Sequence, residues 1–310
     1  MKIVFMGTPD FAVETLRVLL ESPKHTVAAV VTQPDKQKGR GNVVQFSPVK
    51  ELALSYQIPV YQPVKVREES FMEILRKIDP DIIVVVAFGQ ILSKEILELS
   101  RYGCFNVHAS LLPKYRGAAP IQWAIINGEK ETGVTIIKMD TGIDTGDMIK
   151  KAVVLIDKKE TGESLFQKLS KIGGPLMLEV LDELENGTAV FEKQEEAQAC
   201  YVKKLEKETG RILWSDSAER ISCLVRGLNS WPSAYTTLNE KIVKIWEAEV
   251  YDQEWEGNCG EIVKVEKNRF LVKTGQGTLG VLEVQLEGKK RMKTDAFLRG
   301  YPLQVGIQLK

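Results

Sequence analysis

The sequence predicts two domains, an α/β domain built on a mostly parallel sheet and a small β-barrel that follows it. The chain opens with a strand, a helix and a second strand, the order that produces parallel strands joined by right-handed crossovers. Residues 81–88 are an apolar, β-branched run without polar alternation, which is typical of a strand buried on both faces. Residues 235–309 hold closely spaced strand-like runs separated by glycine and asparagine turns, which favours a small barrel.

The composition is that of a globular protein, and it restricts the chemistry. The chain has 310 residues, of which 44% are hydrophobic and 27% are charged, and its 42 basic and 42 acidic residues give no net charge. A nucleic-acid partner would therefore be met by a local basic patch. With only 2 histidines a multi-histidine metal site is excluded, and we expect no metal. The cysteines follow no C-x-x-C pattern and indicate a reducing compartment; they are Cys104, Cys200, Cys223 and Cys259.

No targeting segment is expected at the amino end. The first apolar run begins at Ile3, with neither a long hydrophobic region nor a small-residue cleavage site. No apolar stretch approaches the roughly 20 residues that a membrane span needs. We therefore expect a cytoplasmic protein without a membrane partner. We also expect a monomer, although neither of these features bears on the oligomeric state.

The first domain is expected to begin with a strand at residues 2–8 and a helix from Pro9 and Asp10, where proline suits a first turn and aspartate the positive helix end. The turn between them reads G-T-P-D. Because it lacks the G-x-G-x-x-G fingerprint, a dinucleotide-dependent dehydrogenase is disfavoured. The later elements are a strand at 26–32, a flexible basic loop at 33–42, helices at 48–56 and 67–78, strands near 60 and at 81–88, 106–108, 134–138 and 147–156, a helix from 119, and a helix at 161–185 interrupted at 173–175.

A polar, charged stretch is expected to link the domains at residues 191–207. The domains would then cover residues 1–190 and 208–310. In the second domain, the apolar spacing at 218–228 predicts an amphipathic helix. Its strands are expected at 235–238, 241–250, 260–266, 269–274, 278–285 and 304–309.

Residues 104–148 hold the candidate chemistry. Asn106 and His108 stand two residues apart on a predicted strand and would project from the same face. A loop with two glycines and three aspartates follows at 139–147. If Asp144 folds back onto His108, an amide, an imidazole and a carboxylate come together. The alternative is a polar strand end followed by an ordinary turn.

These three side chains suit the attack of an amine on a carbonyl carbon. Asn106 and a protonated His108 can each donate a hydrogen bond to the oxygen on which negative charge develops. A carboxylate at Asp144 would orient the imidazole and take the proton that the amine loses. Cys104 shares the strand face with Asn106 but lies deeper, so we expect it in the core and no covalent intermediate is needed.

The segments FNVHASLLPKYRGAAPIQWAI and ETGVTIIKMDTGIDTGDM resemble the catalytic core of the folate-dependent formyltransferases. RGAAPIQ, QPDKQKGRG and the terminal barrel resemble the members that act on methionyl initiator tRNA. The resemblance implies a Rossmann-like first domain and an OB-like barrel. It implies formyl transfer from 10-formyltetrahydrofolate to the α-amine of the methionyl group, in support of translation initiation. It also implies that Asn106, His108 and Asp144 are the catalytic residues.

The same resemblance assigns two binding regions. Folate would be held by residues that follow two strands, namely Phe88, Gly89, Gln90, Ile91, Leu92, Ser110, Leu111, Leu112 and Pro113. The loop at 33–42 would lie near the tRNA acceptor end, although a solvated basic loop has the same composition. The densest basic cluster, at 288–293, would add phosphate contacts beside a barrel of a kind that often binds nucleic acid. The expected tRNA contacts are Lys36, Lys38, Arg40, Lys289, Lys290, Arg291 and Lys293.

Two alternatives stay open. One is a formyltransferase for another amine, such as a phosphoribosyl glycinamide or an amino-sugar nucleotide. Residues 206–310 argue against the first, and the lack of a dehydrogenase-like partner domain argues against the second. The other alternative is a non-catalytic protein that binds tRNA or folate and only keeps the fold. An intact trio argues against it, and formyl-transfer assays of His108→Ala and Asp144→Asn would separate these readings.

Overall fold

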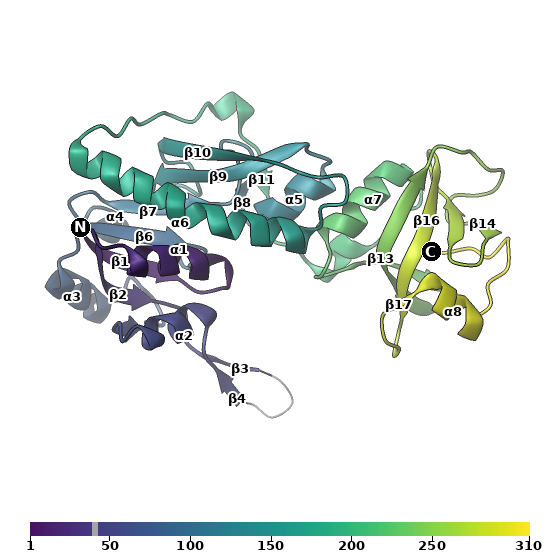
Figure 1. Cartoon of the computed structure of the whole chain (residues 1–310), viewed down its shortest axis with the longest axis horizontal. Coiled ribbons are helices and arrows are strands. Elements are labelled where there is room, and N and C mark those ends of the chain that lie inside the picture. Colours follow the sequence, from purple (N-terminus) through teal and green to yellow (C-terminus); the bar gives the residue numbers. More distant parts are fainter. Residues whose placement is uncertain (39–42) are drawn as a thin grey trace. The chain divides into compact units, whose positions relative to one another are not determined.

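The structure is a computed structural model that describes residues 1–38 and 43–310 (Figure 1). Arg40 lies outside the described residues, and so do the side chains of residues 36–38 and 43–44. The described chain divides into two compact units. The first unit consists of Met1–Gly117, Thr132–Val154 and Phe166–Tyr201, and the second of Ala118–Glu131, Leu155–Leu165 and Val202–Lys310.

The first unit is built on a mostly parallel sheet, as the sequence predicted. The pairs β1–β2, β1–β6, β6–β7 and β2–β5 are parallel, and β9 joins β7 in the antiparallel direction. The carboxyl ends of β1, β6 and β7 therefore lie at one edge of the sheet, where ligands bind in open α/β folds. In spatial order the strands found in the described residues are β10 (Met148–Leu155), β9 (Glu131–Lys138), β7 (Cys104–His108), β6 (Ile82–Val86), β1 (Lys2–Gly7), β2 (Thr26–Val31) and β5 (Val60–Tyr61).

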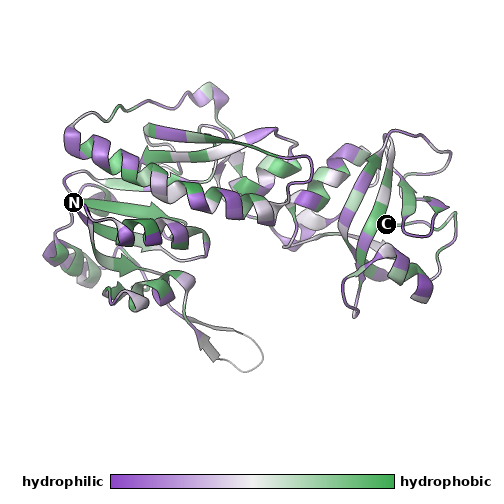
Figure 2. Cartoon of the chain, viewed as in Figure 1, coloured by the Kyte–Doolittle hydropathy of each residue, from purple (hydrophilic) through white to green (hydrophobic). Residues whose placement is uncertain are grey.

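Helices cover both faces of this sheet, which explains why its central strands are apolar throughout. All residues of β6 are buried. One face packs on α3 and α4 through residues such as Phe71, Met72 and Ile96, while α1 and α6 cross the other face (Figure 1). Figure 2 shows hydrophobic strands beside helices that carry both kinds of residue. These helices are α1 (Phe11–Glu21), α2 (Pro48–Ser55), α3 (Glu69–Ile78), α4 (Lys94–Leu97) and α6 (Gly162–Asn186).

Serine side chains fix where several helices begin. Ser47 Oγ accepts the backbone N–H of Lys50 at 3.2 Å at the start of α2, the cap that the sequence predicted. Ser217 does the same for Arg220, also at 3.2 Å, at the start of α7 (Ala218–Gly227). Each cap satisfies one backbone donor that the first turn leaves without an intrahelical partner. No helix in the described part of the chain combines the length and the apolar character needed to cross a membrane.

Helix α6 is continuous where the sequence predicted an interruption. It contains Pro175 and the two preceding glycines without a break. The glycines serve close packing instead. A Cβ atom on Gly173 would lie 2.7 Å from Val107 Cγ1 and 2.9 Å from Thr15 Oγ1. Because such separations are shorter than carbon contacts allow, glycine at this position lets α6 approach β7 and α1 closely.

Two further expectations about the amino-terminal part are wrong. The basic loop contains a hairpin, β3 (Lys36–Lys38) paired with β4 (Val43–Gln45). Lys50 anchors the base of this hairpin, since its Nζ lies 2.5 Å from Asp35 Oδ2. His25, predicted in a surface turn, is buried, and its Nδ1 lies 3.3 Å from the Met1 nitrogen.

The second unit is an antiparallel sheet around one hydrophobic core. Alternate residues of β13, Val243 and Ile245, meet Ile221 and Val225 of α7 in that core. Figure 1 labels most of the helices and strands of this unit. The sheet order is β12-β13-β16-β15-β14, with β17 on β16. The elements of this unit, besides α7, are α5 (Pro120–Ile126), η2 (Lys207–Gly210), β12 (Ala234–Leu238), β13 (Lys241–Tyr251), β14 (Ile262–Val265), β15 (Phe270–Lys273), β16 (Thr278–Leu286), β17 (Met292–Lys293) and α8 (Thr294–Gly300).

The last described residues join the two edge strands of this sheet. Lys310 and Thr237 of β12 exchange two backbone hydrogen bonds, of 2.7 and 3.0 Å. Leu309 N–H donates to the carbonyl of Gly260, just before β14, at 2.8 Å. The strand predicted at 304–309 is thus replaced by backbone hydrogen bonds and one bridge, and α8 was not predicted. The connection still supplies the closure that a barrel requires.

Residues 191–207 are more structured than a linker. Met148 and Glu192 exchange two backbone hydrogen bonds of 2.8 Å. The segment then forms η1 (Glu196–Gln198) and β11 (Tyr201–Val202), which pairs with β8 (Arg116–Gly117). The boundaries at 190 and 208 stay a prediction.

Candidate active site

The candidate side chains gather where β7 ends. Along this strand Asn106 and His108 alternate with Val107, which is 2% exposed and packs inward. β9 runs antiparallel to β7, and the loop that follows it begins where Met139 N–H donates to the Cys104 carbonyl at 2.8 Å. This loop carries Asp144 to the same strand.

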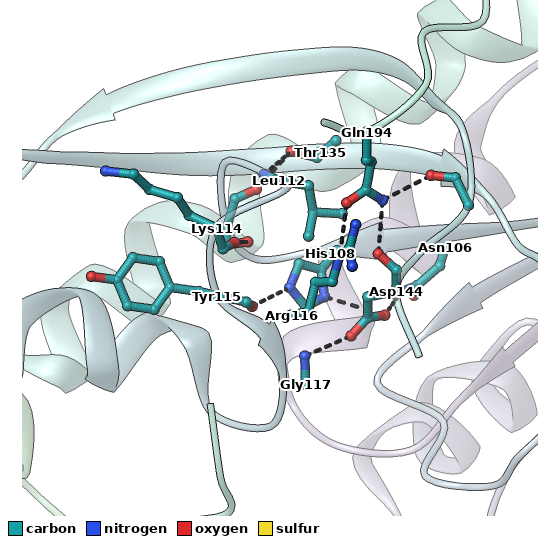
Figure 3. A network of polar contacts seen from close by, with 12 residues as sticks. Asn106, His108, Leu112, Lys114, Tyr115, Arg116, Gly117, Thr135, Asp144 and Gln194 are labelled. Carbon is teal, nitrogen blue, oxygen red and sulfur yellow. Dashed lines mark hydrogen bonds and ion pairs between the residues drawn. The ribbon is translucent and has the colours of Figure 1, made fainter. Parts of the chain in front are cut away.

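Asn106, His108 and Asp144 lie together in the structure (Figure 3). Asn106 Nδ2 donates to Asp144 Oδ1 at 3.3 Å, and His108 Nδ1 is 3.6 Å from the same oxygen. The second carboxylate oxygen, Oδ2, accepts the backbone N–H of Gly117 at 2.8 Å. The side chains of His108 and Asp144 are only 7% and 16% exposed, so salt and water screen them weakly.

Hydrogen bonding fixes one proton of the His108 ring. Nε2 lies 2.9 Å from the carbonyl oxygen of Tyr115. A carbonyl can only accept, so Nε2 carries a hydrogen. Nδ1 faces Asp144 at a distance longer than an ordinary hydrogen bond. Asn106 has two amide hydrogens, and one of them is used in the hydrogen bond to Asp144. A substrate oxygen can therefore use the other Asn106 hydrogen, with the Nδ1 edge of the imidazole beside it.

The Asp144 loop has an unusual backbone. Asp144 has φ +54°, a left-handed conformation that residues other than glycine adopt rarely and that needs support from its surroundings. Gly146 passes directly against the end of β9, where a Cβ atom would overlap the Lys138 carbonyl oxygen. The position of the carboxylate thus depends on contacts that the loop makes with other segments.

The sequence reading missed two residues that supply such contacts, Arg116 and Gln194 (Figure 3). Gln194 Nε2 donates to the carbonyls of Asp144 and Gly146 at 2.7 and 2.8 Å. Arg116 is 1% exposed, and its Nε donates to Gln194 Oε1 at 2.9 Å. Arg116 belongs to the RGAAPIQ segment that carries the family resemblance, but the sequence did not indicate that its side chain is buried. Gln194 is 50 residues from Asp144, and no local pattern pointed to it.

Comparison with known families accounts for both units. Residues 1–181 match the family model described as formyl transferase, and residues 204–302 match the formyl transferase C-terminal domain. The chain belongs to the formyl transferase family. The trio therefore lies within the part of the chain that matches the formyl transferase model.

Relatives within the formyl transferase family cover the whole chain. A methionyl-tRNA formyltransferase of Agathobacter rectalis is 56% identical over 306 residues, which are 99% of this chain and 98% of the relative. One of Lachnospira eligens is 52% identical over 100% of this chain and 99% of its own length. One of Clostridioides difficile is 49% identical over the full length of both. At such identity and coverage the two-unit organisation is shared.

Solved structures confirm the fold. The sugar 3N-formyl transferase WlaRD, solved with dTDP and 5-N-formyl-THF, aligns with a TM-score of 0.69 at 22% identity, over 94% of this chain and 99% of that chain. A methionyl-tRNA formyltransferase from Clostridium thermocellum aligns with a TM-score of 0.56 at 22% identity, over 82% and 95%. At this identity the likeness concerns the arrangement of elements alone.

The residues after β7 that were assigned to folate are mostly buried, and they make hydrogen bonds within the protein next to the site. Ser110 is fully buried, and its Oγ donates to the Lys114 carbonyl at 2.7 Å. The Leu112 N–H donates to Thr135 Oγ at 3.1 Å, and this hydroxyl in turn donates to the Ser110 carbonyl at 2.7 Å. Pro113 is buried and Leu111 partly buried. These bonds fix the chain directly beyond His108.

The residues after β6 that were assigned to folate are divided between core and surface. Phe88 and Leu92 are 2% and 6% exposed and belong to the core. The intervening residues, including Ile91 at 83% exposure, line an open cleft of about 310 Å³. The cleft is lined by Gln33, Val64, Lys65, Arg67, Gly89, Gln90 and Ile91. The two apolar side chains, Val64 and Ile91, and the two cations suit a molecule with an aromatic part and a negative charge.

The cations assigned to tRNA are not equivalent. Lys289 and Lys290 are exposed. Arg291 is also exposed, but it donates to Glu283 at 2.7 Å and stands over the Trp246 ring, 4.5 Å from its centroid. Lys293 lies 2.5 Å from a Glu247 oxygen. The roles assigned to Lys36 and Lys38 concern side chains outside the described part, as does Arg40.

One reactive side chain and one cluster of titratable side chains do not belong to the trio. Burial raises the pKa of Cys104 to about 12, which keeps this thiol protonated in neutral solution, in agreement with its predicted core position. In the described part of the chain, His25, Asp182 and Glu185 are close enough together to hold a cation. His25 precedes β2, at the opposite edge of the sheet from the trio, and burial lowers its pKa.

Proposed function

We propose that the chain transfers the formyl group of 10-formyltetrahydrofolate to the α-amine of methionyl initiator tRNA, in the cytoplasm. The meeting of Asn106, His108 and Asp144 supports this, in a chain that is 56% identical over 99% of its length to a methionyl-tRNA formyltransferase. The site geometry argues for the chemistry, and the relatives argue for the substrate.

The proposed mechanism is direct attack. The amine nitrogen bonds to the formyl carbon, and its oxygen gains negative charge. The second Asn106 amide hydrogen and the Nδ1 hydrogen of a protonated His108 stabilise this oxyanion; each donor of this kind typically contributes about 10²–10³ in rate. Asp144 takes the proton that the amine loses. The proton reaches the folate nitrogen as its bond to the formyl carbon breaks, so that tetrahydrofolate leaves without a covalent enzyme intermediate.

The two substrates would meet at the carboxyl edge of the sheet. We place folate against the cleft of Gly89, Gln90 and Ile91, where the backbone of a surface loop can hydrogen-bond the ring system. The role of residues 110–113 is then to shape the end of β7. Lys289 and Lys290 are proposed to contact tRNA phosphates, which would strengthen binding without reading sequence.

The experiment that tests this is transfer of a labelled formyl group from 10-formyltetrahydrofolate to charged initiator tRNA. We expect label on the methionyl amine. Phosphoribosyl glycinamide and an amino-sugar nucleotide serve as competing acceptors. Preferential labelling of either acceptor, or no transfer to any of them, would contradict the proposal.

A further inference from the structure

Gln194 differs from the residues around it. Within residues 191–200 every side chain is exposed except Gln194 and one alanine. The segment is held at both ends by backbone hydrogen bonds. Glu192 pairs with Met148, and at the other end the segment accepts the N–H of Arg116 at 2.9 Å. The backbone therefore delivers the one partly buried polar side chain of this segment to the Asp144 loop.

The carboxamide of Gln194 matches three partners. Its oxygen accepts the Arg116 Nε–H at 2.9 Å, and its nitrogen donates to the carbonyls of Asp144 and Gly146 at 2.7 and 2.8 Å. Because a guanidinium only donates and a carbonyl only accepts, these partners also decide which end of the amide is oxygen and which is nitrogen. No other uncharged side chain of this length offers one acceptor and two donors.

Arg116 holds this amide in place. A guanidinium that is 1% exposed must have its donors satisfied inside the protein. Its Nη1 lies 2.9 Å from Glu196 Oε2 and 2.9 Å from the Tyr201 hydroxyl, while its Nε donates to Gln194. The arginine thus ties three residues of one segment to the strand β8.

We infer that Gln194 is a positioning residue for formyl transfer. It holds the loop in its left-handed turn at Asp144, so that the carboxylate meets Asn106 and His108. The inference rests on the proposed function of that trio. It gives Gln194 a role in the active site, whereas the sequence alone suggested that its segment only connects two domains.

The direct test is Gln194→Glu, an isosteric change. The variant keeps an oxygen for Arg116 but presents a second oxygen, instead of two N–H groups, to the carbonyls of Asp144 and Gly146. We expect kcat to fall roughly 10-fold to 100-fold, as small displacements of a reacting group do, with both KM values within about threefold of wild type. Gln198→Glu is the matched control, because Gln198 is exposed in the same segment. It should keep the wild-type kcat.

Two further measurements separate positioning from general stability. If Gln194 acts through Asp144, then Gln194→Glu should cost little more activity in an Asp144→Asn background. Independent, multiplying losses would overturn the inference. Hydrogen exchange of the peptide covering residues 139–147 should accelerate in Gln194→Glu while the rest of the first unit stays protected. Unchanged exchange there would also overturn it.

The two proposals fail in different ways. If the wild-type protein transfers no formyl group to methionyl-tRNA, the proposed function is wrong, whatever Gln194 does. If the wild-type protein is active, and Gln194→Glu retains full kcat with a protected loop, the inference about Gln194 alone is wrong. The exchange experiment needs no substrate and therefore tests the support of the loop in either case.

Discussion

The trio in the first unit and the basic cluster at residues 288–293 in the second are both polar, but they are built differently. Asp144 is 16% exposed and is held by fixed donors from β7, from Gly117 and from the Gln194 segment. In the basic cluster Lys289 and Lys290 are exposed. The comparison teaches that residue type alone does not identify a chemical site. Buried, positioned groups serve chemistry, whereas exposed charges act through a screened field.

The largest effect is expected from removing a donor of the trio. In Asn106→Ala we expect kcat to fall by about 10²–10³, because one hydrogen bond to the developing oxyanion is lost. Steady-state kinetics with both substrates measures this. Asn186→Ala, at an exposed position of the same unit, should leave kcat unchanged. If Asn106→Ala keeps the wild-type kcat, Asn106 does not take part in the chemistry, and the contrast between the trio and the basic cluster is wrong.

The next largest effect should come from disturbing the packing behind the trio. Gly173→Ala places a methyl group against Val107, which lies between Asn106 and His108 on β7. Overpacking of this kind typically lowers the free energy of unfolding by about 1–3 kcal/mol. Chemical denaturation measures it. Gly300→Ala, where an added Cβ meets nothing within 4 Å, is the control and should be neutral. Equal stability of both variants would mean that α6 does not constrain β7.

A smaller effect is expected in the basic cluster. Replacing both Lys289 and Lys290 by alanine should raise the KM for tRNA roughly 3-fold to 10-fold at low salt and leave kcat unchanged, since phosphate contacts supply affinity only. The rise should fade as salt is added. Lys267→Ala, at another exposed turn of the barrel, controls for loss of one charge. A lower kcat with constant KM would show that the cluster takes part in the chemistry.

The smallest effect concerns the paired part of that cluster. Arg291 donates to Glu283 and holds the pKa of this carboxyl below its ordinary value of 4.5. A depressed pKa stabilises the fold above pH 4.5, and the contribution is lost as the pH falls below that value. Because Arg291 is 44% exposed, we expect less than about 1 kcal/mol. Acid unfolding of Glu283→Gln should lack this component, and Glu240→Gln, an exposed control, should keep it. Identical acid profiles for Glu283→Gln and wild type would exclude the pair as a source of stability.

Local patterns predicted the elements that local forces determine. The β-branched run at 81–88 became β6, the serine before Pro48 became a helix cap, and the alternation at Asn106 and His108 placed both side chains on one face. Each of these depends on neighbours within a few residues. The family resemblance then linked the Asp144 loop to the same strand.

Long-range contacts decided what the sequence could not predict. The interruption expected at Gly173 does not occur, because the glycine is used for contact with β7 rather than for a break. The strand expected at 304–309 is replaced by hydrogen bonds to two separate strands. Gln194 contacts the Asp144 loop although β10 and α6 separate the two in the chain. No window of neighbouring residues contains that information.

The most direct test of the central claim is single-turnover formyl transfer by Asp144→Asn with saturating 10-formyltetrahydrofolate and methionyl initiator tRNA. The substitution keeps the size of the side chain and removes the proton acceptor at which Asn106, His108 and Gly117 converge. We predict a rate at least about 100-fold below wild type, with unchanged binding of both substrates. A wild-type rate in this variant would contradict the assignment of the trio as the catalytic centre.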